Sequence, residues 1–124
     1  MSFESWEAVE RHPVAGAVWE THVVIETLKT FSALGRTTPI WFWRTASGEE
    51  VDLIIERDGR VTIIECKASE MVDESALKGL RAFIRAYGAD TVRHAYVASR
   101  TKTPYPLKGD VSVIPGIRIG EYIS

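Results

Sequence analysis

The sequence predicts an α/β domain whose core follows the order helix, three strands, helix, strand. Three observations predict it: a long apolar repeat at helical spacing near the N-terminus, three strand-like runs separated by turn signals, and an amphipathic helix followed by a buried strand. A chain of 124 residues, 45% of them hydrophobic, is long enough for one domain with an apolar core and too short for a second domain beside it. We therefore expect a single domain over residues 1–124, with its core at about 14–100 and a mixed sheet flanked by helices.

The first predicted helix covers residues 14–34. Its apolar residues recur at helical spacing and form a stripe that we expect to face the core. The stripe consists of Val14, Val18, Ile25 and Leu28, widened by Ala15, Trp19 and Val23. His12-Pro13 precedes the helix, where the fixed φ of proline costs little, and Gly35 supplies a stop after it.

Three strands are predicted at 40–45, 50–56 and 61–67. The first is rich in β-branched and aromatic residues, and a Ser-Gly pair at 47–48 supplies the turn that follows. The Asp-Gly pair at 58–59 is the strongest short-range signal for a hairpin. Together these signals predict three consecutive antiparallel strands.

A second helix is predicted at 75–87, with one apolar face and basic residues elsewhere. It is followed by a buried strand at 92–98. Because parallel pairing requires a crossover connection, we expect this strand to lie parallel to the strand at 61–67. After a loop, the chain is predicted to end in a pair of short strands at 111–114 and 117–119.

Charge and cysteine content limit the functional classes. The formal net charge of −2, from 15 basic and 17 acidic residues, gives no overall attraction to a phosphate backbone, so nucleic acid would have to bind a local patch. The single cysteine, Cys66, excludes an internal disulfide and a thiolate zinc site. No secretory signal is recognisable, and no run approaches the ~18 apolar residues of a membrane span. We expect a cytoplasmic protein with no membrane contact.

The charged residues at the end of the third strand carry the candidate chemistry. Strand alternation places Glu65 and Lys67 on one face, about 6–7 Å apart. Asp52, from the preceding strand, lies across from Glu65 if the hairpin register brings the two to one level. Two carboxylates with waters form a site for Mg²⁺ or Mn²⁺, and a lysine can stabilise charge on a phosphate.

Three stretches of the chain carry a family resemblance. They are VWETHVVIETL, which contains Glu20, the R-T-x-x-G-x-E-V-D stretch at 44–52 and the E-x-K-x-S stretch at 65–69. This pattern resembles the PD-(D/E)XK nuclease superfamily. More narrowly, it resembles the uncharacterised domain that follows the ATPase module in a group of bacterial and archaeal AAA-type ATPases. The match covers about residues 16–100, and the ATPase module is absent from this chain.

The resemblance implies a restriction-endonuclease-like αβββαβ fold. It also implies that Glu20, Asp52, Glu65 and Lys67 occupy the catalytic positions, with Asp52 and Glu65 as ligands of Mg²⁺ or Mn²⁺.

Several residues have alternative interpretations. Glu26 is a rival to Glu20 on another face of the same helix. Arg44 could hold a phosphate or pair with Glu50, and Glu50 could support the site. The pair of Glu65 and Lys67, taken alone, is typical of a solvated surface ion pair.

The aromatic run Trp41, Phe42 and Trp43 could stack on bases, but we expect core packing. Lys102 is the second candidate for a phosphate contact beside Arg44. It belongs to a set of basic residues that could form a rim for nucleic acid: Arg81, Arg85, Arg93, Arg100, Lys102 and Lys108. The histidines show no spacing suited to a zinc site.

The sequence therefore favours a Mg²⁺-dependent phosphodiesterase, an endonuclease or exonuclease, that hydrolyses DNA through a metal-activated water. The alternative is a catalytically inactive nuclease-like module that binds nucleic acid or a protein partner, as an accessory to an AAA-type ATPase or as a homodimer. A purely structural role follows if the carboxylates lie apart.

Overall fold

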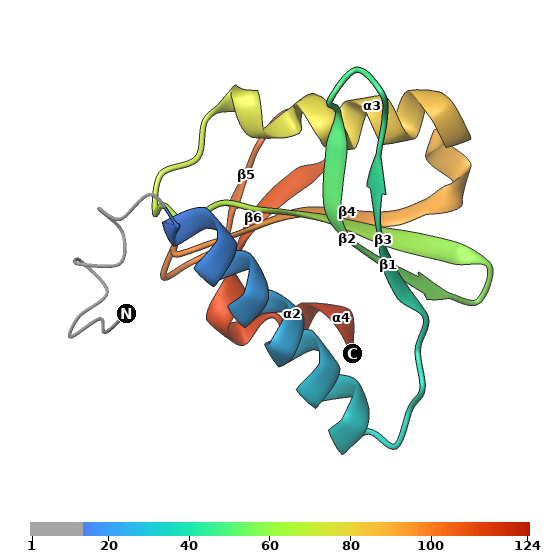
Figure 1. Ribbon diagram of the computed structural model, residues 1–124, viewed down its shortest axis with the longest axis vertical. Coiled ribbons are helices and arrows are strands. Elements are labelled where there is room, and N and C mark those ends of the chain that lie inside the picture. Colours follow the sequence, from blue (N-terminus) through green and yellow to red (C-terminus); the bar gives the residue numbers. More distant parts are fainter. Residues whose placement is uncertain (1–13) are drawn as a thin grey trace.

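The computed structural model describes residues 14–124, which form one mixed sheet with helices on both faces (Figure 1). The predicted start of the first helix at His12-Pro13 lies outside these residues. The elements in chain order are α2 (Ala15–Ala33), β1 (Ile40–Arg44), β2 (Glu50–Arg57), β3 (Arg60–Cys66), the 3₁₀ turn η1 (Glu74–Leu77), α3 (Lys78–Tyr87), η2 (Ala89–Thr91), β4 (Val92–Ser99), β5 (Tyr105–Pro106), β6 (Val111–Pro115), η3 (Gly116–Arg118) and α4 (Gly120–Ile123).

The sheet has six strands in the order β1-β2-β3-β4-β6-β5. β1, β2 and β3 form an antiparallel meander, and β3, β4 and β6 run parallel. The turn between β2 and β3 has positive φ at both Asp58 and Gly59, as a type I′ hairpin requires. The α/β fold class, the meander and the parallel crossover through α3 are all confirmed.

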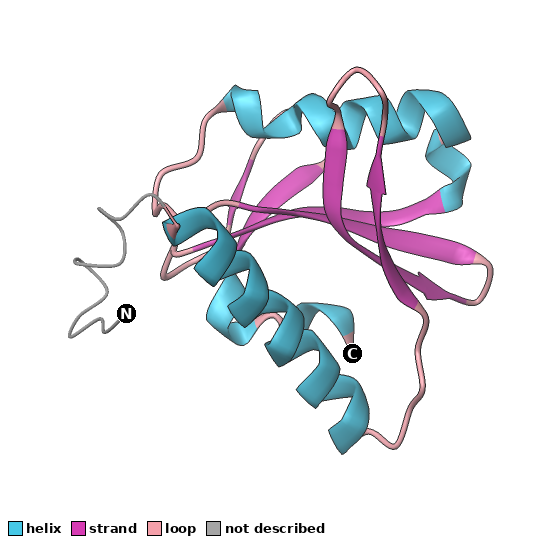
Figure 2. Cartoon of the chain, viewed as in Figure 1, coloured by secondary structure: helices cyan, strands magenta, loops and turns pink. Residues whose placement is uncertain are grey.

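Helices lie on both faces of the sheet (Figure 2). One hydrophobic core on each face holds them there. On one face α3 packs its predicted apolar side, including Leu80 and Phe83, against Ile63, Val97 and Val113. On the other face α2 and α4 cover a second set that includes Leu53, Ile64, Ala98 and Ile114. Adjacent residues such as Ile63 and Ile64 therefore serve opposite cores, as strand alternation requires.

The buried face of α2 differs from the predicted stripe. Its buried residues are Ala15, Trp19, Val23, Thr27 and Phe31, at a regular spacing of four. Val14, Ile25 and Leu28, which we expected in the core, are exposed. Apolar residues occur on several faces of α2, and the face that carries Trp19 and Phe31 is the buried one. Thr27 is accommodated on this buried face because its hydroxyl donates to the Val23 carbonyl. No helix within residues 14–124 has the length and apolar character needed to span a membrane.

The predicted terminal strand pair is half correct. The run at 111–114 belongs to β6, which pairs with β4 and with the short strand β5. The run at 117–119 is not a strand, because it lies across the 3₁₀ turn η3 and leads into α4. Ile119 is fully buried in the α2-side core, whereas Ile117 is exposed. The apolar residues at 117 and 119 suggested a strand, but they belong to a tight turn that buries only one of the two side chains.

Candidate functional site

Asp52 and Glu65 lie opposite each other at one end of the sheet, near the start of β2 and the end of β3. The hairpin register pairs Leu53 with Ile64, so one residue further from the turn Asp52 lies opposite Glu65. This is also the carboxyl end of the parallel strands β3, β4 and β6, the edge at which open α/β sheets bind ligands.

A β-bulge lies at Asp52. Two steps along β1, from Trp41 to Trp43, match three steps along β2, from Ile54 to Val51. As a result Val51 and Leu53 pack into opposite cores although they are two residues apart. Bulges redirect side chains next to functional sites, and this one sets the direction of Asp52. The sequence gives no sign of it.

The two carboxyl groups are in hydrogen-bond contact. The pKa of Glu65 is raised to about 9. Burial is the largest cause, followed by the hydrogen bond to Asp52 and the charge of Asp52. Glu65 is only 8% exposed. The Cys66 backbone N–H donates to Asp52 Oδ2 at 2.8 Å. With this raised pKa, Glu65 carries a proton at neutral pH.

Glu20 reaches this pair from α2. It lines a small hollow of about 180 Å³ together with Asp52, Glu50 and Phe42. Burial raises the pKa of Glu20, and the charges of Asp52 and Glu50 raise it further. The rival residue, Glu26, instead forms an ion pair with Lys29 at 3.1 Å. The structure thus brings Glu20, not Glu26, to the carboxyl pair.

Lys67 lies one residue beyond the end of β3 and is exposed. Its charge lowers the pKa of Glu65, against the larger effects of burial and Asp52. Within the described part of the chain no ion pair joins the exposed Lys67 to an acid. Its backbone N–H donates to the Ala98 carbonyl, which also accepts from Trp19 Nε1 at 3.0 Å.

Glu50 is a further acid of the site, and Arg44 is its partner. Arg44 Nε lies 3.1 Å from Glu50 Oε2, so the structure contains the ion pair that was one of the two interpretations of Arg44. The charge of Glu50 raises the pKa of both Glu20 and Glu65. Burial raises the pKa of the Cys66 thiol, with smaller contributions from Asp52, Glu20 and Glu65. Four carboxyl groups thus gather around the end of β3.

Gly79, in the first turn of α3, is a positioning residue that the sequence did not reveal. A Cβ atom at this residue would overlap the backbone carbonyl of Glu50. Only glycine therefore lets α3 pack this closely on the first residue of β2. Because Asp52 follows Glu50 by two residues, the contact also fixes where the site begins.

The aromatic run of β1 divides between core and surface. Trp43 packs edge-on against Phe83 and Tyr87 of α3, as expected of a core residue. Trp41 and Phe42 are 44% and 65% exposed, so the expectation of core packing was wrong for both. Their side chains face solvent on β1, which is an edge strand of the sheet. Phe42 lies under Arg44, 5.8 Å from its guanidinium carbon.

The basic residues do not form one rim. Arg81 and Arg85 pair with Glu74 and Glu49, each at 3.4 Å. Arg93 lines one hollow of the molecule, whereas Arg100 and Lys102 line another beside α2. Lys102 is exposed and does not line the hollow that holds Glu20 and Asp52. The second candidate phosphate contact is therefore not part of that hollow.

Among residues 14–124, no group of three or more His, Cys, Asp or Glu side chains is placed to hold a metal ion. The oxygen ligands on offer are the pair Asp52 and Glu65, with Glu20 nearby. Mg²⁺ is commonly held by one or two carboxylates and keeps several waters. The pair of Asp52 and Glu65 therefore fits a hydrated hard cation. A bound cation would take the place of the proton that Glu65 carries.

A family model matches residues 15–118, which include every element from α2 to the end of η3. The family is described as a domain of unknown function, DUF4143. The chain belongs to the DUF4143 family. The match covers the whole DUF4143 sheet together with all four candidate catalytic positions.

Two curated relatives of this DUF4143 domain are uncharacterized proteins from Mycobacterium bovis and Mycobacterium tuberculosis. Each is 40% identical over 60 residues, which is 48% of this chain and 13% of the mycobacterial protein. The chain thus spans about an eighth of the length of the curated relatives it matches. No solved structure matches it significantly.

Proposed function

We propose that this DUF4143 domain is a Mg²⁺-dependent phosphodiesterase that hydrolyses DNA, as the resemblance to PD-(D/E)XK nucleases implies. The observation that carries the proposal is the contact between the carboxyl groups of Asp52 and Glu65. The two acids are held together in a largely buried position, where Glu65 carries a proton that an ordinary carboxyl group does not carry at neutral pH. A structural role alone does not call for this arrangement.

The hollow beside Asp52 suits a hydrated cation. Its volume of about 180 Å³ has room for a few waters, at roughly 30 Å³ each. Glu65 does not itself line this hollow but contacts Asp52, which does, and the two carboxyl groups would hold Mg²⁺ as oxygen ligands, with waters and substrate oxygens completing the shell. When bound, the ion would polarise a phosphoryl oxygen and acidify a coordinated water.

The remaining residues have distinct roles in the proposal. Glu20 orients the attacking water by hydrogen bonding and accepts a proton from it, which its raised pKa favours. Lys67 directs its ammonium group to the phosphate and stabilises the charge that develops there. The exposed ring of Phe42, at the rim of the hollow, offers a face for stacking on an unpaired base.

A catalytically inactive nuclease-like module is the second candidate. It is favoured by one observation: the proton on Glu65 and the Cys66 N–H on Asp52 already satisfy the pair without a cation. Such a module would bind nucleic acid or a protein, as a homodimer or beside an AAA-type ATPase. The much greater length of the mycobacterial relatives leaves room for further domains there. In both cases we propose the reducing cytoplasm, which suits the single free cysteine.

Calorimetric titration with Mn²⁺ separates the two candidates. The parent should bind Mn²⁺ with a saturable signal that Asp52→Ala abolishes, because one of two ligands is lost. Asp90→Ala removes an exposed acid outside the site and serves as the matched control, so its binding should equal that of the parent. Binding that is absent in the parent, or unchanged in Asp52→Ala, contradicts the metal site.

Cleavage of supercoiled plasmid then tests chemistry. Lys67→Ala should slow cleavage by about 100-fold while changing Mn²⁺ affinity less than about threefold, since Lys67 stabilises charge and is not a ligand. An active Lys67→Ala variant would remove Lys67 from the catalytic set. Mn²⁺ binding by the parent without any cleavage would favour the inactive module.

A further inference from the structure

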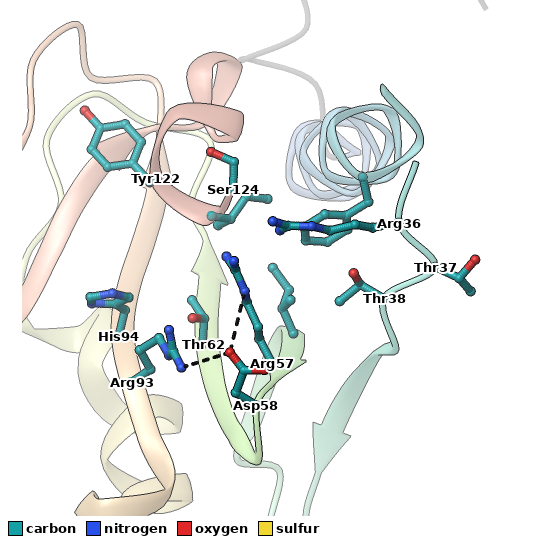
Figure 3. Close-up of a pocket in the computed structure, with 13 residues that line it drawn as sticks. Arg36, Thr37, Thr38, Arg57, Asp58, Thr62, Arg93, His94, Tyr122 and Ser124 are labelled. Carbon is teal, nitrogen blue, oxygen red and sulfur yellow. Dashed lines mark ion pairs between the residues drawn. The ribbon is translucent and has the colours of Figure 1, made fainter. Parts of the chain in front are cut away.

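A second hollow, of about 450 Å³, lies at the opposite end of β2 from Asp52 (Figure 3). Its walls are the loop after α2, the sheet near the β2–β3 turn and the C-terminal residues of α4. Arg57 is five residues from Asp52 along β2, or about 17 Å in an extended strand. The hollow is therefore separate from the carboxyl site.

Three arginines gather at this hollow with one carboxylate. Asp58 Oδ2 lies 4.0 Å from Arg57 and 3.8 Å from Arg93, which is longer than a hydrogen bond in both cases. The Asp58 side chain is 78% exposed, so solvent screens it. Within residues 14–124 the Arg36 side chain has no acidic partner. The guanidinium groups thus keep an excess of positive charge and most of their donors.

Hydroxyl groups add to the donors. In Figure 3 Arg36 and Thr38 point into the hollow, whereas Thr37 points away. Thr62 is buried at the floor, on β3, and in the described part of the chain its hydroxyl has no hydrogen-bond partner. This hydroxyl can therefore donate to a ligand in the hollow.

We propose that this hollow binds the phosphate group of a small phosphate monoester, such as a nucleotide. Arginine presents planar paired donors that match phosphate oxygens, and among the side chains that line the hollow three arginines outnumber the one aspartate. The volume is that of sites for small ligands. Because walls close the hollow on several sides, it suits a terminal phosphate better than a continuous nucleic-acid backbone. The proposal does not depend on the nuclease function.

Calorimetry with pyrophosphate as the probe, on the full chain, tests the site. The parent should bind with one saturable site, and Arg57→Gln and Arg36→Gln should each weaken binding about tenfold or more. Arg81→Gln is the matched control, because Arg81 is a half-exposed arginine on α3, on the other face of the sheet, also with one acidic partner. When pyrophosphate binds, the NMR chemical shifts of the backbone amides of Thr38 and Thr62 should change. Asp52→Ala should leave pyrophosphate affinity unchanged, whether or not it abolishes Mn²⁺ binding.

Several results would overturn the proposal. They are the absence of saturable binding in the folded parent, equal affinity in Arg57→Gln and Arg36→Gln, and amide shifts confined to the hollow beside Arg100 and Lys102. An oligonucleotide with a terminal phosphate should displace pyrophosphate, and the same strand without that phosphate should not. Equal displacement by both would show a site for the nucleic-acid backbone instead of a terminal phosphate.

Discussion

Glu65 stands at the end of a buried strand as a carboxylic acid, not as a carboxylate. Burial and the neighbouring Asp52 favour the neutral form, which can donate a hydrogen bond to Asp52. This arrangement resolves the electrostatic problem of two acids in contact, since a lone buried charge is costly whereas a shared proton is not. The same pair is consequently sensitive to any cation or pH change that competes for the proton.

We predict that Glu65 makes the protein less stable as the pH rises. Its pKa is about 9 in the folded protein, against 4.5 for an unperturbed glutamate, so between these values the folded protein holds a proton that the unfolded chain has lost. The free energy of unfolding should fall by up to about 1.4 kcal/mol per pH unit in this window. In Glu65→Gln, urea unfolding should show most of this slope removed.

The exposed Glu56 on the same hairpin is the control for this experiment, and Glu56→Gln should keep the slope of the parent. A Glu65→Gln variant with the full parental slope would mean that Glu65 is already ionised at neutral pH.

Single residues were predictable where strand alternation and turn residues determine them. The Asp-Gly turn was predicted from the sequence, whereas the register that places Asp52 opposite Glu65 was left open there and is given by the structure. The bulge at Asp52 and the close approach at Gly79 do not follow from the sequence, because both depend on packing between distant elements. Glu50 was recognised only as a supporting group, since its effect on Glu20 arises across the gap between α2 and β2.

At the scale of elements, the contact of α3 with β2 gives a prediction for Gly79. Gly79→Ala should lower the free energy of unfolding by about 1–3 kcal/mol, because the new Cβ must displace the Glu50 backbone. The displacement should also weaken Mn²⁺ binding at Asp52. Gly16→Ala, where a Cβ meets nothing within 4 Å, is the control for denaturation and titration. A Gly79→Ala protein as stable as the parent would show that α3 can shift freely.

The C-terminal turn gives a second prediction at this scale. Ile119→Ala should cost about 2–5 kcal/mol, because this side chain is fully buried between α2 and the sheet. Ile117→Ala, two residues earlier and 63% exposed, should change stability by less than about 0.5 kcal/mol. Equal effects in urea unfolding would be expected of a β-strand pair at this end, not of the observed turn.

The elements themselves were predictable to different extents. The meander and α3 followed from turn residues and clear periodicity, and both have the expected bounds within one to three residues. The existence of α2 also followed, but not its orientation, since apolar residues occur on several of its faces. The role of 116–123 depends on the groove between α2 and the sheet, which local sequence does not describe.

For the whole molecule, the net charge of −2 hides a division of charge between the two ends of the sheet. Carboxyl groups gather where β3 ends, and arginines gather where it begins. The net charge therefore describes only the average over the molecule, and it does not exclude binding of nucleic acid or phosphate at one end of the sheet. The fold creates two local environments of opposite sign, each suited to a different ligand.

The most direct test of the account is anomalous diffraction from crystals of the parent soaked in Mn²⁺. We predict a peak between Asp52 and Glu65, about 2.0–2.3 Å from a carboxylate oxygen of each, with Glu20 facing it across coordinated water. A structure at saturating Mn²⁺ in which these two carboxyl groups remain hydrogen-bonded to each other, with no peak between them, would contradict the proposed metal site.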